Sequence, residues 1–294
     1  MRLILPLPGS ESFSAQVAAA GGFELARLEF RRFPDGERYI RIDADPKGRP
    51  VDIVCQDADE HFLTLAFVAD ALRDIGAGQV TLVAPYLGYM RQDARFRPGE
   101  AVTSRTFARL VSSTVDCLVT IDPHLHRFST LDELYDIPCT ALRAAPLLAD
   151  WIAREVPMPL IIGPDAESEQ WAAEIADASG APYAVLAKRR TGDRHVEIAV
   201  PDLKAHRGRQ PVLIDDIASS GRTLIAASAE LRKLGFTEPV CVVVHAIFGG
   251  DAFERTAEAV TRIVSTDTLP HRSNAISVAR LIADALPGQG AIRR

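Results

Sequence analysis

The sequence predicts an α/β protein with two similar domains, each a mostly parallel sheet flanked by helices. Short apolar, β-branched runs alternate with amphipathic segments along the whole chain, which is the pattern of parallel strands covered by helices. The 294 residues are about twice the usual length of a single domain, so two medium domains are favoured over one large domain.

In the first half of the chain, a series of short apolar runs predicts strands. These runs are Leu3–Leu5, Leu25–Phe30, Tyr39–Ile42, Val51–Cys55, Val80–Ala84 and Cys117–Ile121. Amphipathic patterns at about 61–76 and 103–114 fill gaps between them and predict helices.

The second half repeats this order. Its predicted strands are Leu160–Gly163, Tyr183–Ala187, Val196–Val200, Val212–Ile214, Val240–Val244 and Ile263–Ser265, with helices near 167–179, 222–235 and 274–286. The run from Ile137 to Thr140 leads into a predicted helix over 144–154, which Val156-Pro-Met-Pro159 ends. We therefore expect domains at 1–143 and 144–294, with the last helix a candidate for packing back on the first.

Composition narrows the class of protein. The chain is 47% hydrophobic and 24% charged, and no apolar run approaches the roughly 18 residues of a membrane span, so we expect a cytoplasmic protein without a membrane partner. The four cysteines are scattered singly, which indicates buried thiols rather than a zinc site. A net charge of −6 argues against nucleic acid, whereas basic residues gathered at 89–97 and 188–194 favour small anionic ligands.

Several predicted strands run directly into a polar cluster. The clusters are Gln56-Asp57, Pro85-Tyr86, Asp122-Pro-His124, Pro164-Asp165 and Asp215-Asp216. Open α/β sheets bind ligands at the carboxyl ends of their strands, so each cluster is a candidate wall of a site. A single Asp in such a place is more often a helix cap or a turn former.

The most specific signal is the string Val212-Leu-Ile-Asp-Asp-Ile-Ala-Ser-Ser-Gly-Arg-Thr223. A strand would carry Asp215 and Asp216 at its end, small residues would let backbone N–H groups approach an anion, and the next helix would begin there. The two acids could accept hydrogen bonds from ribose hydroxyls, so a sugar phosphate fits this loop. An ordinary strand–turn–helix explains one Asp, but not the whole string.

This string resembles the phosphoribosyl pyrophosphate loop of phosphoribosyltransferases and of ribose-phosphate diphosphokinases. Other segments are similar to the diphosphokinases alone, in the same order along essentially the full chain. These are Phe33-Pro-Asp-Gly-Glu37, the segment from Tyr86 to Glu100, Asp122-Pro-His124, Gly163-Pro-Asp165 and Ala187-Lys-Arg-Arg190. The stretch from Arg97 to Glu100 resembles the archaeal type. The resemblance implies two phosphoribosyltransferase-like domains, the first binding ATP and the second ribose 5-phosphate.

The resemblance also implies roles for individual residues. Lys188, Arg190 and His124 would be catalytic; Phe33, Asp35, Glu37, Arg91, Gln92 and Asp93 would bind ATP; Asp165, Asp215, Asp216, Ser219, Ser220, Gly221, Arg222 and Thr223 would bind ribose phosphate. Magnesium (Mg2+) would be the cofactor, with His124 and Asp165 beside it. Phe33 and its acids would serve a neighbouring subunit, so a homo-oligomer with shared active sites is expected.

Some assignments keep an alternative. His124 could contact phosphate rather than metal, and Lys188–Arg190 could be no more than an exposed hairpin turn that ends at Gly192-Asp193. Two places depart from the family pattern: Arg222 stands where a glycine is usual, and 166–171 bring in Glu167 and Glu169 where paired glycines are usual. Arg222 could contact the 5-phosphate or point into solvent, and the two acids would repel a phosphate unless they face outward or meet metal.

The resemblance therefore predicts transfer of the pyrophosphoryl group of ATP to the 1-hydroxyl of ribose 5-phosphate. The alternative is a non-catalytic regulatory paralogue that binds an active synthetase, for which Arg222 and the acids after Asp165 are the reasons. A base-transferring phosphoribosyltransferase ranks last, because it leaves Phe33–Glu37 and Arg91–Asp93 without a role.

Overall fold

The chain divides into two units, each with its own sheet. The computed structural model describes residues 1–190, 196–199 and 202–286. Unit 1 comprises Met1–Leu142 and the segment that begins at Val278, and unit 2 comprises Arg143–Ser277.

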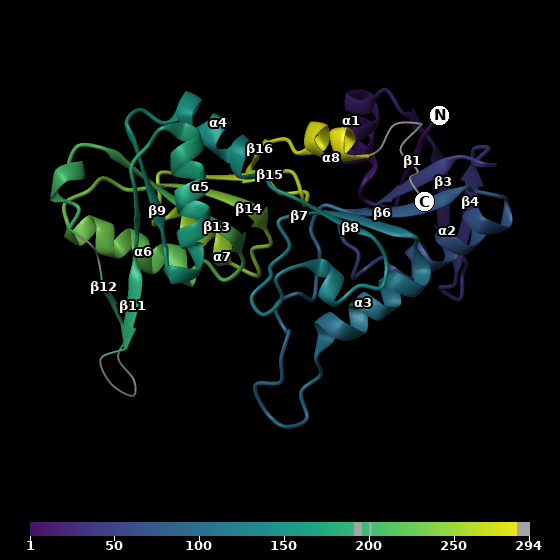
Figure 1. Cartoon of the computed structure of the whole chain (residues 1–294), viewed down its shortest axis with the longest axis horizontal. Helices are drawn as coiled ribbons and strands as arrows, with labels where there is room; N and C mark the ends of the chain where they lie inside the picture. The colour runs from purple at the N-terminus through teal and green to yellow at the C-terminus, as the bar shows by residue number, and fades with distance from the viewer. Residues whose placement is uncertain (191–195, 200–201, 287–294) are drawn as a thin grey trace. The chain divides into compact units, whose positions relative to one another are not determined.

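Unit 1 is built on a six-stranded sheet (Figure 1). Its strands are β1 (Leu3–Pro6), β2 (Glu24–Leu25), β5 (Pro50–Val54), β6 (Gln79–Ala84), β7 (Cys117–Ile121) and β8 (Cys139–Leu142), in the order β2-β1-β5-β6-β7-β8. Every pairing in this sheet is parallel. Outside it, β3 (Arg27–Arg32) and β4 (Arg38–Asp43) pair as an antiparallel hairpin.

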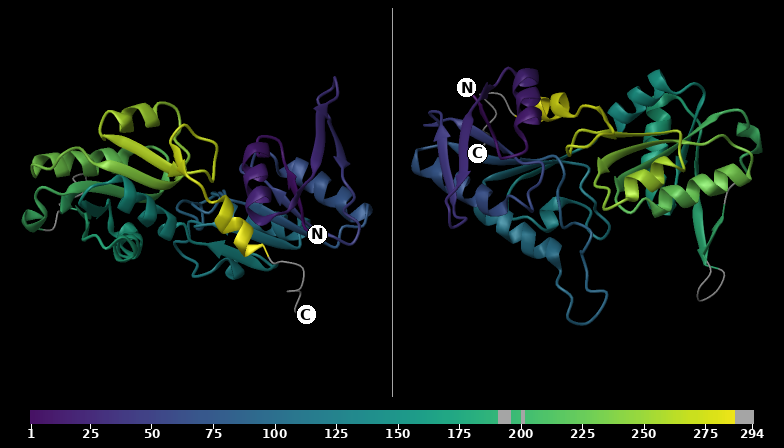
Figure 2. Two further views of the ribbon diagram at one scale, coloured as in Figure 1. Left: turned by 90° about the horizontal axis from the view of Figure 1, so that it is seen from above. Right: turned by 180° about the vertical axis from the view of Figure 1, so that it is seen from behind.

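The helices of unit 1 pack in two pairs. They are α1 (Glu11–Gly21), α2 (Phe62–Asp74), α3 (Thr103–Thr114) and α8 (Ala279–Ala285), with a single 3-10 turn, η1, at Leu131–Glu133. Helix α8 packs against α1, and both views of Figure 2 show them side by side; α2 packs against α3. The last helix of the described residues is thus part of the unit that contains the first helix.

Unit 2 repeats the plan. Strands β9 (Pro159–Gly163), β10 (Tyr183–Val185), β13 (Gln210–Ala218), β14 (Val240–Ala246), β15 (Arg262–Thr266) and β16 (Asn274–Ile276) form a parallel sheet in the order β10-β9-β13-β14-β15-β16. An antiparallel hairpin of β11 (Ala187–Arg190) and β12 (Val196–Ala199) stands apart from it. The helices are α4 (Ala145–Glu155), α5 (Glu169–Ser179), α6 (Arg222–Lys233) and α7 (Ala252–Ala257), with 3-10 turns at Ala166–Ser168 (η2) and Lys204–His206 (η3).

The two units therefore share one topology, and the predicted fold class is confirmed. In each unit the first strand lies second in the sheet, the next lies at the edge, a hairpin follows, and the remaining strands are added in order. The strand order reverses beside β1 in unit 1 and beside β9 in unit 2. In sheets of this kind, ligands bind where the order reverses, at the carboxyl ends of the strands.

Some predicted elements differ from the observed ones. Residues 25–30 divide between β2 and the β3–β4 hairpin, and 183–187 divide between β10 and β11. A helix was expected from 274, but Asn274–Ile276 pair with β15 as β16 and α8 begins only at Ala279. Short edge strands carry too few apolar residues to show a period of their own, which explains β16 and the unpredicted β8. Val200, the last residue of one predicted strand, lies outside the described residues.

Each unit has its own apolar core. In unit 1, strands β1, β5 and β6 bury Leu3, Ile53 and Leu82 completely, and in unit 2 Leu213 and Val243 are equally buried. The four cysteines were predicted to be buried, and this prediction holds for two of them. Cys55 and Cys241 are buried, whereas Cys117 and Cys139 are half-buried at neighbouring strands.

No helix in the described part of the chain combines the length and apolar character that crossing a membrane requires.

Candidate functional site

The predicted sugar-phosphate loop joins β13 to α6. Asp215 and Asp216 lie near the carboxyl end of β13, Gly221 is the N-cap of α6, and Arg222 is its first residue. Gly221 adopts a left-handed conformation (φ 68°), which glycine reaches without steric cost. A Cβ atom at this position would clash with the Thr256 hydroxyl of α7, so the loop is held against α7 by a close backbone approach.

Asp165 lies beside this loop, at the point where the strand order of unit 2 reverses. It follows β9, which pairs with β13. Its carboxylate accepts the backbone N–H of Ser168, while the Ser168 hydroxyl accepts the backbone N–H of Asp165 at 3.3 Å. This capping box shows how the Ala-Glu-Ser sequence replaces a glycine pair: it folds as a 3-10 turn that leads into α5.

The three acids of this site act on one another. Burial raises the pKa of Asp215 well above its usual value, and the carboxylates of Asp216 and Asp165 raise it further. A negative charge on Asp215 is therefore costly in the free protein. Hydroxyl donors or a cation would lower that cost.

The two departures from the family pattern lie at the first turns of helices, where Arg222 and Glu169 are exposed. Arg222 is exposed at the first turn of α6, and its backbone N–H faces the Ser220 hydroxyl at 3.5 Å. Glu169 is exposed at the first turn of α5, so it faces outward. The backbone of Glu167 belongs to η2, and its side chain lies outside the described part of the chain.

Lys188 and Arg190 belong to the hairpin of unit 2, which projects from the sheet (Figure 1). Their backbones pair with Ile198 and Val196 of β12, so they lie in a strand rather than in the turn itself. The turn expected at Gly192-Asp193 lies outside the described residues. Strand β11 directly follows the edge strand β10, which pairs with β9. The hairpin therefore begins one strand away from β9.

The predicted ATP segment follows β6 in unit 1, and the loop with His124 follows the adjacent strand β7. Each loop contains a non-glycine residue with positive φ, Tyr89 at 65° and Asp122 at 36°. Such strain is uncommon outside turns and functional sites, and it is retained only where the surroundings impose it. The ring centroids of His124 and His126 lie 4.1 Å apart, in an edge-to-face arrangement.

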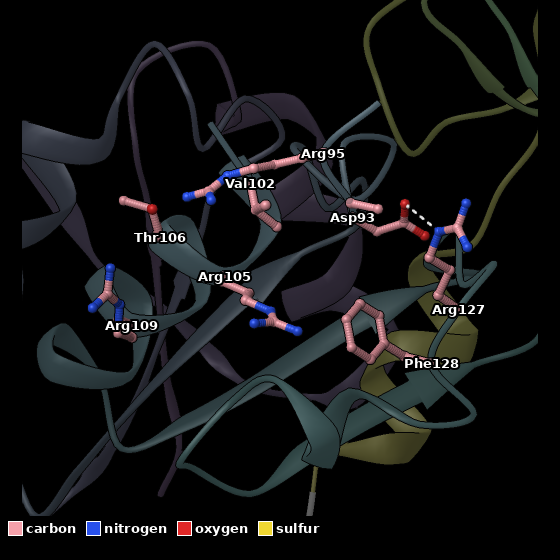
Figure 3. A pocket seen from close by; sticks show the side chains of 9 residues that line it. Asp93, Arg95, Val102, Arg105, Thr106, Arg109, Arg127 and Phe128 are labelled. Atoms are coloured by element: carbon pink, nitrogen blue, oxygen red, sulfur yellow. Dashed lines mark hydrogen bonds and ion pairs between the residues drawn. The ribbon is translucent and has the colours of Figure 1, made fainter. Parts of the chain in front are cut away.

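These two loops and α3 enclose a cavity of about 640 Å3 (Figure 3). Four guanidinium groups line it, from Arg95, Arg105, Arg109 and Arg127, together with Thr106 and Phe128. Asp93 is the one carboxylate among the lining residues, and its Oδ1 accepts the Nε–H of Arg127 at 3.2 Å. Arg91 is exposed and Gln92 is half-buried on the same segment. The cavity therefore carries an excess of positive charge.

Phe33, Asp35 and Glu37 lie at the tip of the β3–β4 hairpin. The backbone N–H of Phe33 donates to the Glu37 carbonyl at 2.8 Å, and the Asp35 carboxylate accepts the N–H of Glu37 at 3.1 Å. Phe33 is 39% exposed, with the guanidinium of Arg31 4.7 Å from its ring centroid. An exposed ring on a turn is available for stacking on a base.

The predicted residues thus form two sets, one in each unit. Phe33–Glu37, Arg91–Asp93 and His124 belong to unit 1, whereas Asp165, Lys188, Arg190 and the loop 215–223 belong to unit 2. Within the described residues, no three His, Cys, Asp or Glu side chains are arranged to hold a metal ion.

Some residues of these sites were not predicted from the sequence. Arg105 and Arg109 stand four apart on a predicted helix, so their common face could have been read from helical spacing. Ser168 follows Asp165 by three residues, which is the spacing of a cap. Thr256 and Arg127 contact distant segments, and no local pattern marks such contacts.

Comparison with known proteins gives a consistent answer for the whole chain. Residues 3–114 match the model of the N-terminal domain of ribose phosphate pyrophosphokinase, and residues 130–278 match the phosphoribosyl transferase domain. A ribose-phosphate pyrophosphokinase from Methanothermobacter thermautotrophicus is 35% identical over 288 residues, which cover 97% of this chain and 99% of that protein. One from Methanopyrus kandleri is 36% identical over 268 residues, covering 90% of this chain and 91% of the relative.

A solved structure agrees with these matches. The phosphoribosylpyrophosphate synthetase from Mycobacterium smegmatis superposes with a TM-score of 0.81 at 25% identity, covering 97% of each chain. The chain belongs to the ribose-phosphate pyrophosphokinase family.

Proposed function

We propose that this protein transfers the pyrophosphoryl group of ATP to the 1-hydroxyl of ribose 5-phosphate, giving phosphoribosyl pyrophosphate and AMP. The observation that carries the proposal is the full-length similarity to proteins named for this reaction, at 35% identity over 97% of the chain. The site geometry supports it, because unit 2 offers an acid-bearing loop at a strand-order reversal and unit 1 offers a cationic cavity.

Ribose 5-phosphate would bind at the loop 215–223. The carboxylates of Asp215 and Asp216 would accept hydrogen bonds from ribose hydroxyls, and the backbone N–H groups of 219–223 would hold the 5-phosphate. Arg222 supports this assignment. A cation at the first turn of a helix is disfavoured by the helix dipole, and a phosphate bound there would offset the repulsion.

ATP would bind through Arg91, Gln92 and Asp93, with Phe33, Asp35 and Glu37 of a neighbouring subunit holding the adenine. The sugar 1-hydroxyl oxygen would attack the β-phosphorus and release its proton to water, the bond from that phosphorus to the α,β-bridging oxygen would break, and AMP would leave with that oxygen. Such a transfer depends on positioning and on neutralising charge. Lys188 and Arg190 would stabilise the charge that develops on the phosphoryl oxygens and on AMP.

Magnesium is the cofactor we propose. One or two of Asp165, Asp215 and Asp216 could serve as its ligands, because burial and the neighbouring carboxylates raise the pKa of Asp215 and a divalent cation would offset the cost of its negative charge. Mg2+ commonly takes only one or two carboxylates and completes its shell with water and substrate phosphates. His124 would then contact phosphate or a metal-bound water. Bound magnesium would neutralise charge on the triphosphate.

A turnover assay tests the proposal. AMP release from ATP and Mg2+ should require ribose 5-phosphate, and Lys188→Ala should lose it while remaining folded. A regulatory paralogue would instead show no turnover alone and would co-purify with an active synthetase, whose rate Lys188→Ala would leave unchanged.

A further inference from the structure

Asp93 is the most deeply buried charged side chain of the ATP segment. Its side chain is only 5% exposed, and the whole residue is buried beneath the loop. Oδ1 accepts the Arg127 Nε–H at 3.2 Å, and Oδ2 has no hydrogen-bond partner among the described residues. A buried carboxylate with one charged partner depends strongly on that partner, because losing it leaves an uncompensated charge.

Arg127 approaches from a different loop. It follows His124 and His126 after β7, whereas Asp93 follows β6, so the ion pair joins the ends of two neighbouring strands. Its side chain is 57% exposed, and its guanidinium lies 5.9 Å from the ring centroid of Phe96. Figure 3 shows Asp93 and Arg127 facing each other at one end of the cavity, with Arg105 elsewhere along its wall.

Other contacts of the segment lie at different places; near its start, the Tyr89 hydroxyl donates to the Asp59 carboxylate. The backbone carbonyl of Gln92 accepts the backbone N–H of Ser104 at 3.4 Å, and the Glu100 carboxylate accepts the backbone N–H groups of Phe96 and Arg97. The latter two bonds fold the tip of the loop on itself and do not fix it to β7. The Asp93–Arg127 pair, by contrast, is a charged link between the ATP segment and the His124 loop.

We propose that Arg127 is a positioning residue, which holds the ATP segment in its binding position through the carboxylate of Asp93. The inference rests on the proposed role of Arg91–Asp93 in binding ATP. Since Arg127 acts through Asp93, its removal weakens ATP binding and leaves ribose 5-phosphate binding unchanged.

Arg109 provides a matched control. It lines the same cavity and carries the same charge, and no ion pair to it is found in the described part of the chain. Arg109→Gln and Arg127→Gln thus remove equal charge from one cavity, but only the second removes the partner of Asp93. A general electrostatic effect on ATP would appear in both variants.

The first experiment compares steady-state kinetics of the purified full chain. Arg127→Gln is expected to raise the KM for ATP about tenfold, with kcat and the KM for ribose 5-phosphate within about twofold of wild type. Arg109→Gln, which removes the same charge but no partner of Asp93, should raise the KM for ATP by no more than about threefold, and Arg127→Lys, which keeps the charge, should recover part of the loss. Equal effects of Arg127→Gln and Arg109→Gln would overturn the proposal.

A double variant separates positioning from direct contact with ATP. If Arg127 acts only through Asp93, Arg127→Gln adds nothing to the KM for ATP in a chain that already carries Asp93→Asn. Multiplicative effects of the two substitutions would show that Arg127 contacts the nucleotide itself, and the positioning role would be rejected.

Amide hydrogen exchange provides a readout that needs no turnover. Peptides covering 86–100 should exchange about tenfold faster in Arg127→Gln than in wild type or Arg109→Gln, because the segment opens more often. If the protein proved inactive, the proposed function would fail, and exchange would still decide whether Arg127 fixes this segment. Unchanged exchange in a folded Arg127→Gln chain contradicts the inference.

Discussion

The backbone of Gly221 packs directly against the side chain of Thr256, so that α7 fixes the turn from which α6 begins. Gly221 has φ 68°, and a Cβ atom there would also lie 3.3 Å from the Ala252 carbonyl oxygen. Helix α7 thus sets the conformation of the proposed phosphate loop.

Gly221→Ala should therefore damage both stability and sugar-phosphate binding. Gly235 is the matched control, because it also has positive φ (81°) but has open space where a Cβ would lie. Gly235→Ala should lower the free energy of unfolding by about 1 kcal/mol, the cost of the conformation alone. Gly221→Ala should cost about 2–4 kcal/mol because of the added clash, and should raise the KM for ribose 5-phosphate about tenfold or more. Urea unfolding measures the free energy of unfolding, and steady-state kinetics measure the KM. Equal losses of stability in Gly221→Ala and Gly235→Ala would disprove the role of α7.

The hairpin β11–β12 carries the residues proposed to stabilise the transition state. Lys188→Ala and Arg190→Ala should each lower kcat by about 100-fold or more, with little change in either KM, since their charge acts on the transferring group. Arg189→Ala, between them, should change kcat by less than about threefold. Rapid-quench measurement of AMP formation tests this, and a loss confined to KM would assign Lys188 and Arg190 to substrate binding instead.

Arg2 and Asp52 form a buried ion pair in unit 1 that gives a prediction for pH. Burial raises the pKa of Asp52 from 3.8 to about 6, against the opposing effect of Arg2. The folded chain thus holds this proton more tightly than the unfolded chain, and the fold gains stability as the pH falls through 6 toward 3.8.

Asp52→Asn, which cannot titrate, isolates that effect. Relative to this variant, wild type should gain about 2 kcal/mol of unfolding free energy between about pH 7 and pH 4. Chemical unfolding across this range measures the difference, and a difference independent of pH would show that Asp52 has an ordinary pKa in the folded chain.

Shared active sites can be tested by mixing inactive chains. If Phe33 serves the adenine of a neighbouring subunit, a mixed oligomer of Phe33→Ala and Lys188→Ala chains contains sites in which both residues are intact. Co-expression should restore up to about a quarter of wild-type activity for random dimers. Activity no higher than that of either parent would place Phe33 and Lys188 in sites built from one chain.

The sequence was sufficient to predict the fold class and the position of most long elements. Helix α3 begins at Thr103 and ends at Thr114, as its amphipathic spacing predicted, and buried strands such as β7 match their apolar runs. These elements are readable because each buries one periodic face or one continuous run. Edge strand β16 was mistaken for a helix, because its three residues gain their structure from pairing with β15.

The candidate site was predictable where chemistry is local. Asp215–Thr223 occupy a strand end and a helix start, which a single loop sequence can encode. Arg127, Thr256 and the cavity of four arginines depend on contacts between segments far apart in the chain. Such contacts depend on the order of strands in the sheet, which the local sequence does not specify.

Phosphorus NMR of the reaction products tests the central claim most directly. With ATP, Mg2+ and ribose 5-phosphate, we predict AMP and a sugar diphosphate in equal amounts, the latter with two coupled phosphorus signals and a separate 5-phosphate signal. Neither product should form without the sugar phosphate. Release of ADP with inorganic phosphate, or consumption of ATP that does not depend on ribose 5-phosphate, would contradict pyrophosphoryl transfer by this protein.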